Sequence, residues 1–275
     1  CYVKKLPGDL DKPMEKPSGM LGLILPTTTS GVEVMMRVYR GVEQTARRHG
    51  YRIVVTYSDH SYENERRQLD HAVEMGCEAV VLYPVVRSRS ELCTDYLKTE
   101  HKDFPMALVD MASPEQGRSI VVFDNYKAGY EMTEMLIKRG HERIAFTEVT
   151  GSDVMVFSII DRYRGYLDAL SAAGLCSREC DKFDLVDWWK PGQDVAARFK
   201  AVLREWQQQV DRATAVIAGE DIMAMHLINA ALEIGISIPD DLTVVGFDNL
   251  DVAQSFRPSF PTTAPDFVRA GAIAA

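Results

Sequence analysis

Residues 215–249 constrain the fold of this chain more than any other stretch, because they form one strand-helix-strand unit. A first apolar run stops at Gly219, and apolar residues then recur at helical spacing until Gly235. After a turn at Pro239, a second apolar run covers residues 242–247. A helix between two strands returns the chain to the edge from which the first strand started, so the strands run parallel. The unit therefore predicts a parallel sheet that is covered by helices.

The same alternation of strands and helices is found along the rest of the chain in two cycles. In the first cycle we expect strands at 20–25, 53–57, 79–83, 106–109 and 120–123, and helices ending near His49 and at 64–75 and 91–99. In the second cycle we expect helices at 126–139, 161–173 and 193–209, and strands at 143–147 and 182–186 before the unit described above. Two such cycles are typical of a two-lobed α/β protein.

The predicted fold is therefore α/β, with two doubly wound parallel-sheet lobes, a hinge near Asp124 and an interlobe cleft. We expect a linker or boundary segment at residues 1–19. The N-terminal lobe is expected to consist of residues 20–123 with 258–275, and the C-terminal lobe of residues 124–257.

Charge and cysteine usage exclude several classes of function. The formal net charge of −9 opposes contact with a phosphate backbone, and no run of basic residues compensates for it locally. The sequence contains no apolar run long enough to span a membrane. The five cysteines are scattered and odd in number, which fits a reducing, cytoplasmic compartment. Cys176 and Cys180 lack a CxxC pair or a histidine cluster nearby, so we predict neither a metal nor a cofactor.

Polar residues follow both strands of the unit at 215–249. Glu220 and Asp221 follow the first strand, and Asp248 and Asn249 follow the second. In open parallel sheets, ligands bind just beyond the carboxyl ends of the strands. The sequence therefore predicts a ligand crevice at this edge.

Five motifs, in the same order and spacing, resemble the effector-binding region of the lactose/galactose-repressor (LacI/GalR) family. They are GHERIAF at 140–146, RYRGYLDAL at 162–170, TAV at 214–216, EDIMAM at 220–225 and IPDDLTVVGFDN at 238–249. The resemblance covers residues 20–275. It implies the two-lobed fold of periplasmic sugar-binding proteins, a sugar-like effector between the lobes, allosteric control of operator affinity, and a homodimer.

The chain also departs from the family pattern. Family members carry an amino-terminal helix-turn-helix, and nothing before Met20 resembles one, so DNA contact is expected only through a separate N-terminal domain absent from this chain. The segment YENERRQL at 62–69 resembles the arabinose-repressor subgroup, in which the DNA-binding part is a winged helix of the gluconate-repressor (GntR) type. The type of that domain stays open at this point, and so does the identity of the effector.

The resemblance assigns ligand contact to Asp248 and Arg162. Asp248 ends a strand, where a carboxylate can accept bonds from two sugar hydroxyls; the alternative is a cap for the next turn. Arg162 is expected to fork onto ligand oxygens, with a surface salt bridge as the alternative. Glu220 stands where the family often has a neutral side chain. It either contacts the ligand and changes ligand preference toward neutral polyols or cations, or caps the following helix.

Further ligand contacts are expected from less specific positions. Asp110 ends the fourth strand and matches a family position that faces the cleft, whereas Asp124 is interpreted as hinge support. One of Trp188 and Trp189 is expected to stack on the ligand, and the sequence does not say which. Thr28 and Ser30 offer hydroxyls in the first loop. Met35 and Met36 face either a partner subunit or the core.

The leading hypothesis is a ligand-sensing domain of a transcription regulator that binds its effector without catalysis. The alternative is a periplasmic or lipid-anchored sugar-binding protein of a transporter, which has the same fold. An enzyme is disfavoured because the sequence has no GxGxxG after the first strand, no nucleophile elbow and no metal ligand set.

Overall fold

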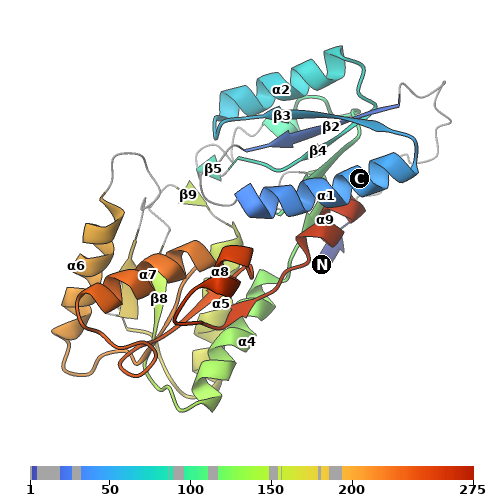
Figure 1. The fold of residues 1–275 in the computed structure, drawn as a ribbon. Coiled ribbons are helices and arrows are strands. Elements are labelled where there is room, and N and C mark those ends of the chain that lie inside the picture. The colour runs from blue at the N-terminus through green and yellow to red at the C-terminus, as the bar shows by residue number, and fades with distance from the viewer. Residues whose placement is uncertain are drawn as a thin grey trace. The chain divides into compact units, whose positions relative to one another are not determined.

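A computed structural model describes residues 2–4, 19–26, 32–85, 87–88, 96–110, 117–148, 154–155, 157–178, 181–185 and 194–275. The chain divides into two compact units (Figure 1). Unit 1 consists of Cys1–Asp124, Asp153–Phe157 and Asp266–Ala275, and unit 2 of Asn125–Ser152 and Ser158–Pro265. Within the described residues, no helix combines the length and the apolarity needed to cross a membrane.

The last crossing between the units lies later in the chain than the sequence suggested. We expected the return to the first lobe at residue 258, but the chain leaves unit 2 only after Pro265. The reason is a short strand, β13 (Thr262–Thr263), which pairs in parallel with β12 (Thr243–Phe247) before the chain leaves. Two residues are too few to show a strand period in the sequence.

Unit 1 is built on a six-stranded sheet in the order β1-β7-β6-β4-β2-β3. Its strands are β2 (Met20–Leu25), β3 (Arg52–Tyr57), β4 (Ala79–Leu82), β6 (Met106–Val109) and β7 (Ser119–Val122), which are parallel, and β1 (Tyr2–Lys4), which pairs antiparallel with β7. The expectation of a linker throughout residues 1–19 was therefore wrong at β1. A second small sheet pairs β5 (Arg87–Ser88) with β9 (Val154–Met155).

The helices of unit 1 cover both faces of its sheet. Helix α2 (Tyr62–Glu74) lies on one face, and α1 (Val32–Arg48) and α9 (Phe267–Ala274) lie on the other (Figure 1). Helices α1 and α9 cross so closely that a Cβ added at Gly41 would lie 1.9 Å from the carbonyl oxygen of Val268. Of the helix expected at 91–99, the described part holds a short 3-10 turn, η1 (Tyr96–Lys98).

The segment YENERRQL, polar in sequence, contributes a buried carboxylate to unit 1. Glu65 in α2 is fully buried, and its Oε2 accepts a hydrogen bond of 2.5 Å from the backbone N–H of Val85. Its Oε1 accepts a bond of 3.2 Å from the Tyr96 hydroxyl. Since a buried carboxylate is tolerated when its oxygens are bonded, Glu65 fixes the chain just beyond β4.

Unit 2 has a parallel sheet in the order β10-β8-β11-β12-β13. Its other strands are β8 (Ile144–Glu148), β10 (Lys182–Asp184) and β11 (Ala215–Ile217). The chain runs from β8 to its neighbour β10 and then returns to the opposite side of β8 to form β11. The order of the strands thus reverses between β8 and β11, and such a switch point opens a crevice at the carboxyl ends of the two strands.

The helices of unit 2 are α4 (Asn125–Lys138), α5 (Phe157–Ala172), α6 (Val195–Gln207), α7 (Asp221–Glu233) and the short α8 (Asp251–Ser255). Helices α4 and α5 cross at two glycines. A Cβ added at Gly129 would lie 2.1 Å from the carbonyl oxygen of Arg162, and one added at Gly165 would lie 2.0 Å from that of Tyr126. Because neither glycine has a side chain, the backbones of α4 and α5 come into contact. This contact fixes the position of the Arg162 backbone relative to α4.

Candidate functional site

The polar residues at the switch point of unit 2 lie on neighbouring strand ends. Thr147 is part of β8, and its hydroxyl accepts a hydrogen bond of 2.8 Å from the backbone N–H of Gly219, just beyond β11. Asp248 follows β12 directly and has a φ of +102°, a conformation that few residues other than glycine adopt. Such a backbone in a non-glycine residue is typical of functional sites.

Arg162 connects these strand ends from α5. Its Nε donates to Oδ1 of Asn125 at 3.0 Å, its Nη1 to the carbonyl of Gly219 at 2.6 Å, and its Nη2 to Oδ1 of Asp248 at 3.2 Å. The guanidinium also lies over the ring of Phe247, 4.4 Å from its centroid. A guanidinium has five N–H donors, so these three bonds leave two for a ligand.

The structure brings Arg162 and Asp248 together, as the resemblance implied. Their side chains are 6% and 12% exposed, so the alternative of a surface salt bridge was wrong for Arg162. Arg162 also has a structural role, because three of its N–H donors bind protein atoms. The ion pair is therefore already formed, by protein side chains alone, at the carboxyl edge of the unit 2 sheet.

Asp221 has a structural role that the sequence did not reveal. It is fully buried, its Oδ1 accepts a 2.6 Å bond from the Thr262 hydroxyl, and its Oδ2 accepts a 2.9 Å bond from the backbone N–H of Leu250. Burial raises the pKa of this carboxyl to about 6, against the effect of the two hydrogen bonds. A Cβ at Gly246 would lie 2.5 Å from Oδ1 of Asp221, which explains the glycine in GFDN.

Glu220 is the acidic side chain at this sheet edge that has no hydrogen-bonding partner among the described residues. It occupies the N-cap position of α7, but its side chain makes no capping hydrogen bond, so the capping alternative was wrong. Among the described residues its carboxyl group makes no hydrogen bond or ion pair, whereas its backbone carbonyl accepts a bond of 3.0 Å from the N–H of Ala224. Burial, and then the charge of Asp248, raises the pKa of Glu220 to about 7, while Arg162 acts in the opposite direction.

The raised pKa predicts how Glu220→Gln changes stability with pH. The folded state holds the Glu220 proton more tightly than the unfolded chain, with a pKa of about 7 instead of 4.5, so its carboxyl lowers the unfolding free energy as pH rises between these values. We expect the glutamine variant to be more stable than wild type by about 1–2 kcal/mol at about pH 8, less than the full shift because the side chain is partly exposed. Urea unfolding at several pH values measures it. Equal stability differences at about pH 4 and about pH 8 would contradict it.

The other predicted aspartates lie at the carboxyl edge of the unit 1 sheet. Asp110 follows β6 with a φ of +62°, and its Oδ2 accepts a hydrogen bond from the hydroxyl of Tyr83, which follows β4. Asp124 is the last residue of unit 1 before the chain enters unit 2, and its role as hinge support stays a prediction.

Four of the predicted ligand contacts, Trp188, Trp189, Thr28 and Ser30, lie outside the described residues. Of the two methionines in α1, Met35 is buried in the core, whereas the side chain of Met36 is half exposed. Sequence reasoning missed Asn125, although the tripeptide Phe-Asp-Asn occurs both at 123–125 and at 247–249. The repeated tripeptide could have identified Asn125 as a residue of the site.

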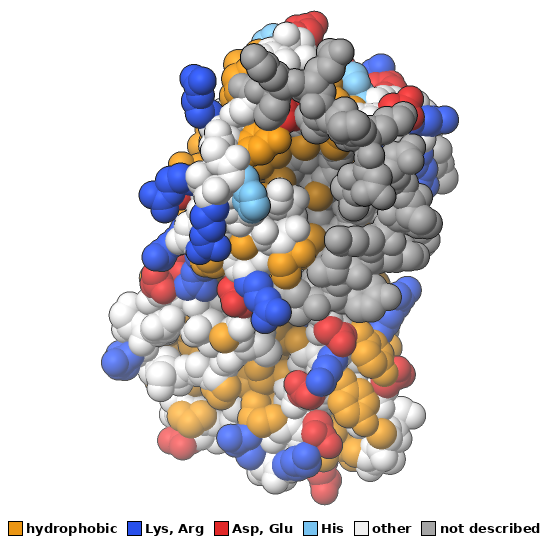
Figure 2. All heavy atoms as spheres, turned by 90° about the vertical axis from the view of Figure 1, so that its right-hand side faces the viewer, with side chains coloured by type: hydrophobic (Ala, Val, Ile, Leu, Met, Phe, Trp, Pro, Cys, Tyr) orange, Lys and Arg blue, Asp and Glu red, His pale blue; other side chains and the backbone are white. Residues whose placement is uncertain are grey.

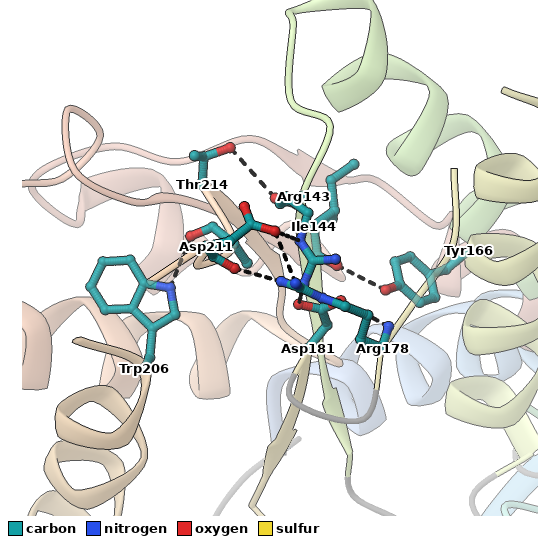
Figure 3. A network of polar contacts seen from close by, with 9 residues as sticks. Arg143, Ile144, Tyr166, Arg178, Asp181, Trp206, Asp211 and Thr214 are labelled. Atoms are coloured by element: carbon teal, nitrogen blue, oxygen red, sulfur yellow. Dashed lines mark hydrogen bonds and ion pairs between the residues drawn. The ribbon is translucent and has the colours of Figure 1, made fainter. Parts of the chain in front are cut away.

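Arg143 of the motif GHERIAF belongs to a structural network away from Arg162 and Asp248. Arg143 pairs with the buried Asp181, which also accepts a 2.8 Å bond from the backbone N–H of Arg178 (Figure 3). Arg178 pairs in turn with Asp211 at 2.9 Å. Since these residues precede β8, β10 and β11, the network secures the amino ends of the strands, opposite to the edge that holds Arg162 and Asp248.

The described residues contain no group of three or more His, Cys, Asp or Glu residues that could hold a metal ion. On the face drawn in Figure 2, basic side chains line one edge of the upper part, and in the lower part they alternate with acidic and polar side chains.

Comparison with known proteins places the chain in a family. The model of the periplasmic binding protein-like domain matches residues 133–275, more than half of the chain. The chain belongs to this family.

The similar proteins are transcription regulators. The HTH-type transcriptional repressor PurR of Erwinia tasmaniensis is 26% identical, over 92% of this chain and 70% of the repressor. The repressor CytR of Escherichia coli K12 is 28% identical, over 82% of this chain and 62% of its own length. A LacI family transcriptional regulator from Mycobacterium smegmatis has a TM-score of 0.74 and 26% identity, covering 92% of this chain and 87% of that one.

A complex of the regulator CelR with cellobiose has the same fold, with a TM-score of 0.76 at 22% identity, covering 94% of this chain and 76% of that one. These findings confirm the two-lobed α/β fold class and the resemblance to effector-binding domains of LacI-family regulators. They do not favour the alternative of a transporter's sugar-binding protein, because the relatives are repressors.

Proposed function

We propose that this chain senses a small sugar-like effector and thereby controls the operator affinity of a transcription regulator. The observation that carries the proposal is the preformed Arg162–Asp248 pair at the carboxyl edge of the unit 2 sheet. It lies at the switch point of a doubly wound sheet, where such folds bind ligands.

The chemistry of the crevice suits a polyhydroxylated ligand. The free N–H groups of Arg162 can donate to sugar oxygens, while the carboxylates of Asp248 and Glu220 can accept from sugar hydroxyls. Sugar as the effector is further supported by the cellobiose named for the CelR complex. We extend the proposed contacts to Asp110 in unit 1, and to Trp188, Trp189, Thr28 and Ser30.

The proposed mechanism is linkage and involves no turnover. An effector that binds one conformation of the regulator more tightly shifts the population toward it, and a coupling of about 1–3 kcal/mol changes operator affinity roughly 5- to 150-fold. We propose that DNA is contacted by a separate domain of a cytoplasmic homodimer. The exposed Val32 and Met36, one helical turn apart on α1, support a partner surface in unit 1.

Calorimetric titration with a panel of hexoses, pentoses and disaccharides tests the proposal. At least one sugar is expected to bind the wild-type chain, and Asp248→Asn is expected to weaken that binding about tenfold or more, because the amide loses the charge-assisted bonds to Arg162 and to the sugar. Binding of the same sugar should not lead to its conversion, as checked by chromatography of the recovered ligand.

Arg164→Ala is the matched control for this titration. Arg164 lies two residues after Arg162 on α5, is exposed, and forms an exposed ion pair with Asp161 at 3.3 Å. Its loss should leave the affinity unchanged. Failure of every sugar to bind a folded wild-type chain would overturn the proposal, as would equal binding by wild type and Asp248→Asn.

A further inference from the structure

Three acidic side chains lie at the carboxyl edge of the unit 2 sheet, and described protein donors bind only two of them. Arg162 is the cation that acts on Glu220 there, and three carboxyls, those of Glu220, Asp221 and Asp248, act on one another around it. Asp248 is paired with Arg162, and both oxygens of Asp221 accept bonds from protein donors. Within the described part of the chain, Glu220 alone of the three has no such partner.

The backbone around Glu220 is held by the protein, whereas its side chain makes no capping bond. Glu220 immediately follows Gly219, whose carbonyl accepts a bond from Arg162 and whose N–H donates to Thr147, so the peptide groups on both sides of Gly219 are fixed. Its extended backbone, with φ of −155° and ψ of 167°, places it before the first turn of α7 without a capping bond. The side chain is partly exposed, whereas Asp221 next to it is fully buried.

We propose that Glu220 makes this crevice select its effector by charge, so that it binds sugars bearing an amine more tightly than neutral sugars and excludes phosphorylated ones. The proposal rests on the proposed function, since it assumes that the crevice binds a sugar. It goes further by assigning the selection of the ligand class to one residue.

The physical reason is that, among the described residues, Glu220 is left as a carboxylate without a hydrogen-bonding partner once Asp248 pairs with Arg162. A ligand ammonium group supplies the missing charge-assisted hydrogen bond to Glu220 and removes its repulsion with Asp248. A neutral hydroxyl gives a weaker bond and leaves the charges unbalanced. A phosphate adds negative charge where two carboxylates already repel each other, and its rejection follows from the same imbalance.

Matched ligands test this inference by calorimetry on the whole chain. The probes are hexoses, their aminodeoxy derivatives and their phosphates, titrated into wild type and Glu220→Gln. For wild type, the amine-bearing sugar is expected to bind about tenfold or more tightly than its parent hexose, and the phosphate about tenfold or more weakly. Glu220→Gln keeps the size of the side chain and removes its charge, so its three affinities should differ by less than about threefold.

The pH dependence supplies a second readout. Below about pH 7 Glu220 takes up a proton in the free protein. The preference of wild type for the amine should therefore be smaller at about pH 5.5 than at about pH 7, a range in which the amine of the sugar stays largely protonated. The charged groups acting on Glu220 are Asp248, Arg162 and Asp221, and all three are retained in the variant.

The outcomes separate this inference from the proposed function. An amine preference in wild type that is lost in Glu220→Gln supports both. Binding of hexoses without an amine preference, or a preference that survives in Glu220→Gln, overturns the inference and leaves the proposed function standing. Absence of binding by all three classes of sugar overturns both. Urea unfolding of the two proteins confirms that the variant is folded.

Discussion

Replacing Arg162 by alanine is expected to remove about 3–5 kcal/mol from the unfolding free energy and to abolish effector binding. The guanidinium is buried and bonds to Asn125, Gly219 and Asp248, so its loss removes the positive charge that pairs with the buried Asp248 carboxylate. Unfolding in urea measures the first effect, and titration with the sugar bound by wild type measures the second.

Two further variants separate the causes of that effect. Arg162→Lys keeps the positive charge but not the planar fork, so it should recover part of the stability and little of the binding. Asp248→Asn in the Arg162→Ala background should recover stability, because it removes the uncompensated carboxylate. A loss below about 1 kcal/mol for Arg162→Ala would show that the buried network does not hold the strand ends together.

Replacing Gly129 by alanine is expected to destabilise the protein by about 3 kcal/mol, although alanine favours helices. The added Cβ would lie 2.1 Å from the carbonyl oxygen of Arg162 and 2.7 Å from its Cα. Since both obstacles are backbone atoms of α5, the two helices must separate. The separation also displaces Arg162 from the strand ends, so effector affinity should fall together with stability. Thermal unfolding and calorimetry measure the two effects.

Ser171→Ala is the matched control for the crossing. Ser171 is exposed near the end of α5, where alanine improves helix propensity without a steric conflict. Its unfolding free energy should stay within about 0.5 kcal/mol of wild type. If Gly129→Ala is as stable as this control, the close approach of α4 and α5 is not required for the fold.

The bounds of several segments with a clear period of apolar residues were predicted to within two residues. The strand at 106–109 has the bounds of β6, and the helices expected at 64–75 and 126–139 correspond to α2 and α4 within two residues at each end. The period of apolar residues is decided locally, so the sequence shows it directly. Short elements were missed: β1 and β13 pair with strands distant in sequence, and nothing local marks two or three residues as a strand.

The candidate site was predicted in part. The resemblance assigned Arg162 and Asp248 to one ligand site, and the structure shows in addition that these residues, 86 apart in sequence, are hydrogen-bonded to each other. The roles of their neighbours were not foreseen. Glu220 and Asp221 are adjacent acids at the start of one helix, and no local pattern distinguishes the free carboxylate from the one that binds Thr262 and Leu250.

The sequence by itself determined the class of the fold, the two winding cycles, and the strand ends at which polar residues gather, because these follow from periodicity and from the handedness of strand-helix-strand connections. Only the tertiary structure decided which carboxyls are satisfied, where the chain leaves unit 2, and how closely α4 approaches α5. Those properties depend on which donors and backbones meet across long sequence separations, and a hydrogen bond or a steric contact has no signature in either partner alone.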